Sequence, residues 1–368
     1  MAAKNPLIVE VTRGAMVESR HRGAAVVMDA KGKAVHAWGE IERIVCPRSA
    51  IKPLQALVLI ETGAAEAYHL TDAELALASA SHGGQAEHTD AVLAWLERIG
   101  LGADDLECGA HEPLDAEIAK ARVRAGESPG PADNNCSGKH AGMLTTAKHL
   151  GEETAGYTRP GHPVQQRLRT ILTDMGGADL SQAPEGTDGC GIPVFGMPLS
   201  AMARALARMA DTGGLEAGRA EAAGRIVAAM MSNPLLVGGR GRFDTVAMEA
   251  ANGVFAVKTG AEGMHGAILP GLGLGVAVKI DDGARRATQV AMAAILDQPG
   301  TRLPGSRRLE NREKAERDGV DALLALTRGV PLHFEPGTSY RYSDTGYILL
   351  GAIVERVSGL SHGEYVES

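Results

Sequence analysis

Aromatic residues are few in this chain and gather at its C-terminal end. The chain of 368 residues has 4 Phe, 6 Tyr and 2 Trp, and five of these twelve fall in its last 38 residues. Between this end and the rest of the chain lie a Pro- and Gly-containing stretch, 301–306, and a densely charged one, 307–318, which is typical of a solvated connector. The sequence therefore predicts a main unit over 1–298, a charged linker over 299–318 and a separate fragment over 319–368.

The composition excludes several classes of protein. Hydrophobic residues make up 44% of the chain, which is enough for a sizeable core and argues against a disordered or fibrous protein. The net charge is −8, and no basic run is long enough to follow a phosphate backbone, so we expect no nucleic-acid partner. No apolar run approaches the ~18–20 residues that cross a bilayer, and the N-terminus lacks the apolar segment of a signal peptide. We expect a cytoplasmic protein without a membrane partner.

Strand patterns lie at both ends of a helix-rich middle. Residues 7–12, 24–38, 253–258 and 271–280 have the pattern of strands. The segment Thr71-Asp72-Ala73-Glu74 is typical of a capping box that opens a helix, and Ser49 is predicted to cap another helix, with Pro53 in its first turn. The predicted fold class is α/β: a mixed or antiparallel sheet flanked by helices, with a helical part.

The spacing Ser49-x-x-Lys52 predicts a Ser–Lys pair. Residues three apart on a helix share a face, so the Lys amine can reach the Ser hydroxyl, and burial can lower the Lys pKa enough for it to act as a base. The short pattern also arises by chance, and Lys258 could be an exposed lysine at a strand end. However, Ser-x-x-Lys followed by a Lys-Thr-Gly strand, here Lys258-Thr259-Gly260, is the order found in serine β-lactamases and penicillin-binding proteins.

Three further polar segments are candidates for a site. Ser81-His82-Gly83-Gly84 could bring backbone close to a ligand, or could simply end a helix. Cys136 and Cys190 lie in polar, Gly-containing segments and could bind Zn²⁺, although isolated thiols are more often buried and structural. By residue type alone, His140 would be the conventional third ligand, because a Lys amine must first lose a proton.

The order of motifs over residues 7–297 resembles the L-asparaginase II family, the rhizobial-type thermolabile L-asparaginases. Nine segments carry the resemblance: 13–23, 47–55, 80–88, 135–143, 162–165, 188–193, 241–245, 258–263 and 279–284.

The resemblance implies hydrolysis of L-asparagine to L-aspartate and ammonia by a homodimer whose fold is related to serine β-lactamases and glutaminases. It implies a nucleophile Ser49 with its base Lys52, and a second pair, Ser81 and Lys258, as relay or alternative nucleophile. The residues implied to contact substrate are Arg48, His82 and Asp188, and those implied to bind zinc are Cys136, Lys139 and Cys190, with Lys139 in place of His140.

The C-terminal fragment resembles an internal piece of a class C β-lactamase or penicillin-binding-type esterase. The resemblance centres on Tyr342-Ser343-Asp344, and no second Ser-x-x-Lys precedes it within the fragment, so we expect the fragment to be non-catalytic. Two alternatives to an asparaginase stay open: another Ser–Lys hydrolase of the β-lactamase or esterase type, and a catalytically impaired protein that binds zinc or an amino acid.

Overall fold

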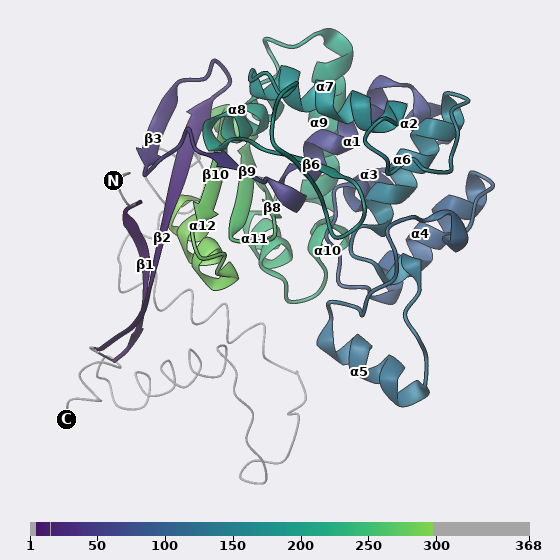
Figure 1. Ribbon diagram of the computed structural model, residues 1–368, viewed down its shortest axis with the longest axis horizontal. Helices are drawn as coiled ribbons and strands as arrows, with labels where there is room; N and C mark the ends of the chain where they lie inside the picture. The colour runs from purple at the N-terminus through teal and green to yellow at the C-terminus, as the bar shows by residue number, and fades with distance from the viewer. Residues whose placement is uncertain (1–4, 15, 297–368) are drawn as a thin grey trace. The chain divides into compact units, whose positions relative to one another are not determined.

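A computed structural model describes residues 5–14 and 16–296 of the chain (Figure 1). Apart from residues 12–14 and 16, these belong to one compact unit. The predicted linker over 299–318 and the predicted fragment over 319–368, with Tyr342-Ser343-Asp344, lie outside the described residues. Among the helices of the described residues, none has the length and apolar character needed to span a bilayer.

The main sheet is built around one long strand. The strand β2 pairs on one side with β10, which is followed by β9 and β8, while β1 and β3 also pair with β2. The registers of the β2–β3, β2–β10, β10–β9 and β9–β8 pairs are all antiparallel, which confirms the predicted α/β class with an antiparallel sheet. The strands are β1 (Leu7–Arg13), β2 (Met16–Asp29), β3 (Ala34–Trp38), β8 (Ala256–Thr259), β9 (Met264–Leu269) and β10 (Leu274–Ile280).

The inner strands are covered on both faces. Every residue of β9 is buried, and because successive strand residues point to opposite faces, both faces must be covered. Two helices, α8 (Leu199–Ala210) and α12 (Arg285–Leu296), both pack against β9 and β10. The sheet is therefore an interior layer of an α/β unit.

The helical part surrounds one buried helix, α1 (Lys52–Glu61) (Figure 1). Residues 52–59 of α1 are all buried, and a helix that is enclosed on every side belongs to an interior. The turn before it, the 3₁₀ helix η1 (Arg48–Ile51), packs against β8 and β9, so the start of α1 lies where the sheet meets the helices. The helices that contact α1 are α2 (Ala64–Ala67), α3 (Asp72–Ala78), α6 (Ser137–His149), α7 (Pro163–Gly176) and α9 (Ala217–Ser232).

Local sequence signals account for some helix ends but not for the start of α1. The capping box is confirmed: the Glu74 backbone N–H donates to Thr71 Oγ1 at 3.3 Å, and the Thr71 N–H donates to Glu74 Oε2 at 2.8 Å. The prediction of Ser49 as an N-cap is wrong, because Ser49 lies within η1 and Ile51 caps α1. The sequence pattern also missed β9, the helices α5 (Ala116–Ala125) and α11 (Phe243–Ala251), and the short helices α2 (Ala64–Ala67) and α10 (Pro234–Gly238).

Two glycines of the sheet let α8 approach its backbone. A Cβ at Gly266 would lie 2.7 Å from Leu206 Cδ1, and a Cβ at Gly275 would lie 2.2 Å from the Ala203 carbonyl oxygen. The second contact is with the backbone of α8, which cannot move aside as a side chain can. Close packing of α8 on β10 therefore depends on Gly275.

We expect Gly275→Ala to lower the free energy of unfolding by about 3 kcal/mol, because the added methyl group must push α8 away from β10. Gly224→Ala is the matched control, because Gly224 is an exposed residue inside α9 with no atom near its missing Cβ. This control should stabilise the protein by ~0.5–1 kcal/mol. Urea unfolding of both variants measures the difference, and equal midpoints would contradict the packing described.

Candidate active site

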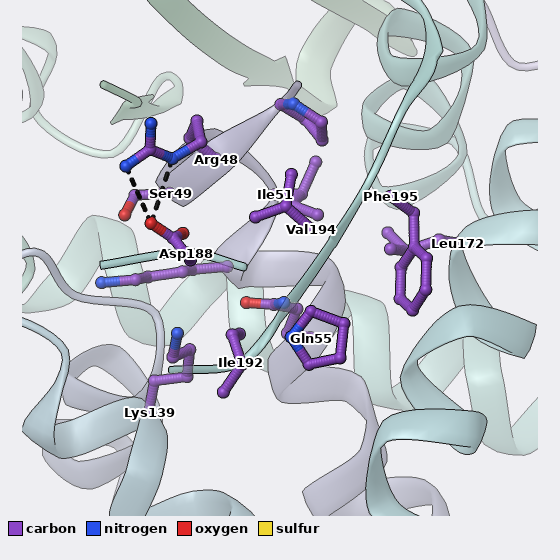
Figure 2. A pocket seen from close by; sticks show the side chains of 13 residues that line it. Arg48, Ser49, Ile51, Gln55, Lys139, Leu172, Asp188, Ile192, Val194 and Phe195 are labelled. Atoms are coloured by element: carbon purple, nitrogen blue, oxygen red, sulfur yellow. Dashed lines mark hydrogen bonds and ion pairs between the residues drawn. The ribbon is translucent and has the colours of Figure 1, made fainter. Parts of the chain in front are cut away.

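The turn η1 presents Ser49 to a pocket. Arg48 adopts a left-handed backbone conformation with φ 51°, which is uncommon for a residue other than Gly. This conformation bends the chain immediately before Ser49, which is partly exposed. The pocket encloses about 320 Å³ of empty space, part of it open to solvent. Figure 2 shows the pocket, with Arg48, Ser49, Lys139 and Asp188 gathered on one side and Leu172 and Phe195 on the other.

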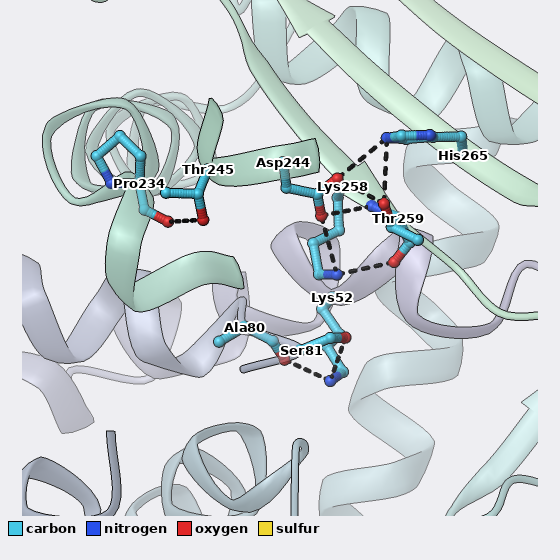
Figure 3. Close-up of polar contacts among 9 residues, drawn as sticks. All are labelled: Lys52, Ala80, Ser81, Pro234, Asp244, Thr245, Lys258, Thr259 and His265. Atoms are coloured by element: carbon cyan, nitrogen blue, oxygen red, sulfur yellow. Dashed lines mark hydrogen bonds and ion pairs between the residues drawn. The ribbon is translucent and has the colours of Figure 1, made fainter. Parts of the chain in front are cut away.

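Lys52 contacts Ser81 and lines the pocket that Ser49 also lines. Its side chain is 1% exposed, lines the same pocket as Ser49, and donates hydrogen bonds to Ser81 Oγ at 3.0 Å and to the Ala80 carbonyl oxygen (Figure 3). Burial lowers the pKa of Lys52, and the charge of Lys139 acts in the same direction, whereas the thiols of the two nearby cysteines oppose it. The structure thus brings Ser81 to Lys52, on the pocket that Ser49 lines.

Lys258 is a second buried amine in this region. It lies near the end of β8, is 2% exposed, and donates to the Thr259 carbonyl oxygen at 2.8 Å. Burial lowers the pKa of Lys258 to about 7, against the opposing charge of Asp244, which lies 3.6 Å away. Among the described residues, the hydrogen bond to the Ser81 hydroxyl comes from Lys52 and not from Lys258. The predicted pairing of Ser81 with Lys258 stays a prediction.

Arg48 and Asp188 are paired with each other. Arg48 Nη2 and Nε lie 2.8 and 3.0 Å from Asp188 Oδ1. Asp188 lies in the loop of a small hairpin formed by β5 (Glu185–Thr187) and β6 (Pro193–Phe195), which also carries Cys190. Burial raises the pKa of Asp188, but the positive charges of Lys139 and Arg48 outweigh burial and lower it. A cation and an anion therefore lie side by side at the pocket.

Both ring nitrogens of His82 lie within hydrogen-bonding distance of groups of the protein itself. His82 is fully buried; the Gly84 backbone N–H donates to its Nδ1 at 3.2 Å, which leaves the proton on Nε2, 2.9 Å from Ser137 Oγ. The ring stacks on His88 with centroids 4.9 Å apart, and burial holds the pKa of His82 well below its usual range. The His82 ring is thus held by contacts within the protein. Substrate contact by His82 stays a prediction.

The three predicted zinc ligands converge. Lys139 Nζ lies 3.0 Å from Cys190 Sγ. The Cys136 thiol donates to Asn135 Oδ1 at 3.1 Å, and the Cys136 and Cys190 thiols are close enough to shift each other's pKa. All three side chains are buried. Burial lowers the pKa of Lys139, but the two thiols outweigh burial and raise it. Two thiolates are soft donors that suit Zn²⁺, and a Lys amine that has lost its proton adds a nitrogen donor, so these residues fit the metal.

His140 does not belong to this cluster. Its Nδ1 lies 2.7 Å from the hydroxyl of Tyr157, which is not one of the three cluster residues. Within residues 5–14 and 16–296, no three His, Cys, Asp or Glu side chains are arranged to hold a metal ion. A metal between Cys136 and Cys190 would thus need the Lys139 amine, as the resemblance implies.

Two residues near the site carry no clear signal in the sequence. Gln55, one turn after Lys52 on α1, lines the pocket (Figure 2). Asp244, in the first turn of α11, contacts Lys258 and Thr259. A single Gln or Asp has no spacing partner in the sequence, so only the family segments 47–55 and 241–245, which include Gln55 and Asp244, point to them.

Two family models match overlapping parts of the chain. A family model described as L-asparaginase II matches residues 9–321, and a β-lactamase model matches residues 300–368. The first match extends beyond residue 297, where the resemblance in the motifs ends, and the two matches overlap over 300–321.

Two proteins with sequence similarity to this chain match it over short stretches. Penicillin-binding protein 4* of Bacillus subtilis is 38% identical over 52 residues, 14% of this chain and 11% of the relative. The human serine β-lactamase-like protein LACTB, mitochondrial, is 45% identical over 56 residues, 15% of this chain and 10% of the relative. The chain thus matches about a tenth of the length of these relatives.

A solved β-lactamase from Mycobacterium bovis aligns over 74% of this chain and 93% of its own, with a TM-score of 0.36 and 12% identity. The L-asparaginase II family match over residues 9–321 spans most of the chain and includes every site residue described above. This chain is a member of the L-asparaginase II family.

Proposed function

We propose that this chain hydrolyses L-asparagine to L-aspartate and ammonia. The observation that carries the proposal is the buried Lys52 amine, which contacts Ser81 and shares a pocket with Ser49, beside the Arg48–Asp188 pair. Amide hydrolysis needs a nucleophile, a group that accepts and returns a proton, and stabilisation of the developing oxyanion. The family match supports a hydrolase of this kind.

The Arg48–Asp188 pair offers a way to recognise an amino acid. A free α-amino acid carries a carboxylate and an ammonium on one carbon, so it can replace the contact between Arg48 and Asp188 with one contact to each. Arg48 would then bind the α-carboxylate and Asp188 the α-ammonium, through charge-assisted hydrogen bonds. After this exchange, each charge of the pair has a new partner. A simple amide carries no charges, so it could not replace the contact between Arg48 and Asp188 without leaving both charges unpaired.

We assign Ser49 as the nucleophile and Lys52 as its base. Ser49 is partly exposed in the pocket, so a substrate can reach it, whereas Ser81 is buried. The lowered pKa of Lys52 increases the fraction of neutral amine that can accept the hydroxyl proton. Ser81, which accepts a hydrogen bond from Lys52, would relay the proton or serve as the alternative nucleophile.

Zinc is part of the proposal through Cys136, Lys139 and Cys190. Bound zinc would hold both cysteines as thiolates and fix the hairpin loop that carries Asp188. The chain's own residues then orient substrate: the loop sets Asp188 opposite Arg48, and the metal shapes the site without taking part in the reaction. The homodimer and the cytoplasmic location stay predictions.

A second candidate is a Ser–Lys hydrolase that acts on β-lactams or esters. The β-lactamase match over 300–368 and the Lys258-Thr259-Gly260 segment favour it. Ammonia release from asparagine, measured beside turnover of a chromogenic cephalosporin and a nitrophenyl ester, separates the two. An impaired protein that binds zinc or an amino acid would instead be stabilised thermally by ligand without turnover.

We expect Ser49→Ala to lower kcat/KM for ammonia release from asparagine at least ~10³-fold, because the nucleophile is lost. Ser81→Ala should also lower it, because Lys52 loses a hydrogen-bond partner. Ser79→Ala is the matched control: Ser79 is a buried serine two residues earlier whose hydroxyl donates within α3 to the Leu75 carbonyl oxygen. Activity like that of the wild type in Ser49→Ala would overturn the nucleophile assignment.

We expect Cys136→Ser and Cys190→Ser each to lose bound zinc, because a hydroxyl replaces a thiolate ligand. Elemental analysis of the purified full chain after dialysis against zinc measures the metal content. Cys46→Ser is the control, since Cys46 is exposed and lies outside the cluster. Zinc retained equally by all three variants would exclude this cluster as the metal site.

A further inference from the structure

Asp244 is a buried carboxylate that the proposed reaction does not use. Its residue is 3% exposed, and both of its oxygens are occupied (Figure 3). Oδ2 accepts from the Thr259 backbone N–H at 2.8 Å and lies 3.6 Å from Lys258 Nζ, while Oδ1 accepts from the Thr259 hydroxyl at 2.5 Å and lies 3.2 Å from His265 Nε2. A buried charge persists only when it is paired and hydrogen-bonded in this way.

These contacts fix the end of β8. Thr259 gives both its backbone N–H and its hydroxyl to the same carboxylate, and on its other side it is paired with His265 of β9. Lys258 Nζ in turn donates to the Thr259 carbonyl oxygen. A displacement of Thr259 would therefore move the Lys258 amine.

Asp244 also balances the charge around Lys258. The groups that act on Lys258 from the elements packed around it are Asp244 of α11, Lys52 of α1, Arg242 before α11 and Cys136 before α6. Lys52 and Arg242 are positive and disfavour a charged Lys258, as burial does, whereas Asp244 is the nearest opposing charge. Without Asp244, the Lys258 amine would have little reason to carry a proton at neutral pH.

We propose that Asp244 is a positioning residue of this site: through Thr259 it holds the Lys258 amine in place, and with its own charge it balances that amine. Where activity is the readout, the proposal rests on the amide hydrolysis proposed above, with Lys258 acting in it as the predicted partner of Ser81. Asp244 thus acts in two ways. In the hydrogen-bonding part, it holds the Thr259 hydroxyl and thereby positions Lys258. In the charge part, its negative charge acts directly on Lys258.

Asp244→Asn tests both parts together. The amide keeps the shape of the side chain, but its nitrogen cannot accept a hydrogen bond, so the Thr259 N–H and hydroxyl compete for one oxygen. We expect kcat for asparagine to fall at least ~10-fold with KM changed less than ~3-fold. The limb of the pH–rate profile nearest pH 7 should move about one pH unit lower, since removing the carboxylate favours neutral Lys258.

Thr259→Val separates the two parts. It removes the hydroxyl contact but leaves the Asp244 charge beside Lys258, so kcat should fall while the pH limb stays in place, and Thr259→Ser should restore kcat. Glu74→Gln is the matched control, because Glu74 is a buried carboxylate of the α3 capping box that is paired with Arg98. It should lower thermal stability and leave the pH–rate profile unchanged.

Two results would overturn the proposal on the activity side. One is a pH–rate profile of Asp244→Asn that coincides with that of the wild type. The other is an unchanged kcat in Thr259→Val, which would show that the Thr259 hydroxyl contact does not place Lys258.

A titration of Lys258 tests the proposal without substrate. Lysine labelled with ¹³C at Cε reports its own protonation by NMR, and the Lys258 signal is identified by its loss in Lys258→Met. We expect the pH midpoint of the Lys258 titration to fall by about one pH unit in Asp244→Asn and to stay unchanged in Thr259→Val. Equal midpoints in the wild type and Asp244→Asn would overturn the charge part. If the wild type released no ammonia from asparagine, the proposed function would fail while this titration still decided the role of Asp244.

Discussion

The burial of Lys52 at the start of α1 is the constraint around which this structure is arranged. An amine can lie inside a protein only where polar groups receive its hydrogens, and here Ala80 and Ser81 do so. Those acceptors belong to the segment after α3, whose place is set in turn by the hydrogen bond from the Ser81 N–H to the Val237 carbonyl oxygen. Burying α1 in the core therefore requires the same placement of Ala80 and Ser81 that builds the candidate site.

Three lysines are buried close to one another, and their charges must be balanced within the protein. Lys139 lies against the thiol of Cys190, Lys258 lies near Asp244, and Lys52 donates to the Ala80 carbonyl oxygen and the Ser81 hydroxyl. Burial lowers the pKa of both Lys52 and Lys258, which favours the neutral amine that a base requires.

The sequence predicts those features whose cause is local. The capping box needs only Thr71 and Glu74, three residues apart, and the family motifs identify the residues that meet in the cluster of Cys136, Lys139 and Cys190. Features set by tertiary contacts are not predicted: α1 begins after Ser49 because Arg48 bends the chain, and Asp244 reaches Thr259 only once α11 packs beside β8. The partner of Ser81 is equally a product of packing.

The site and the β-lactamase-like match can be separated along the sequence. Every side chain used in the proposed reaction, and in the positioning of Lys258, lies between residues 48 and 265, whereas the β-lactamase match begins at residue 300. The proposed reaction therefore draws only on side chains of the part that matches the L-asparaginase II family.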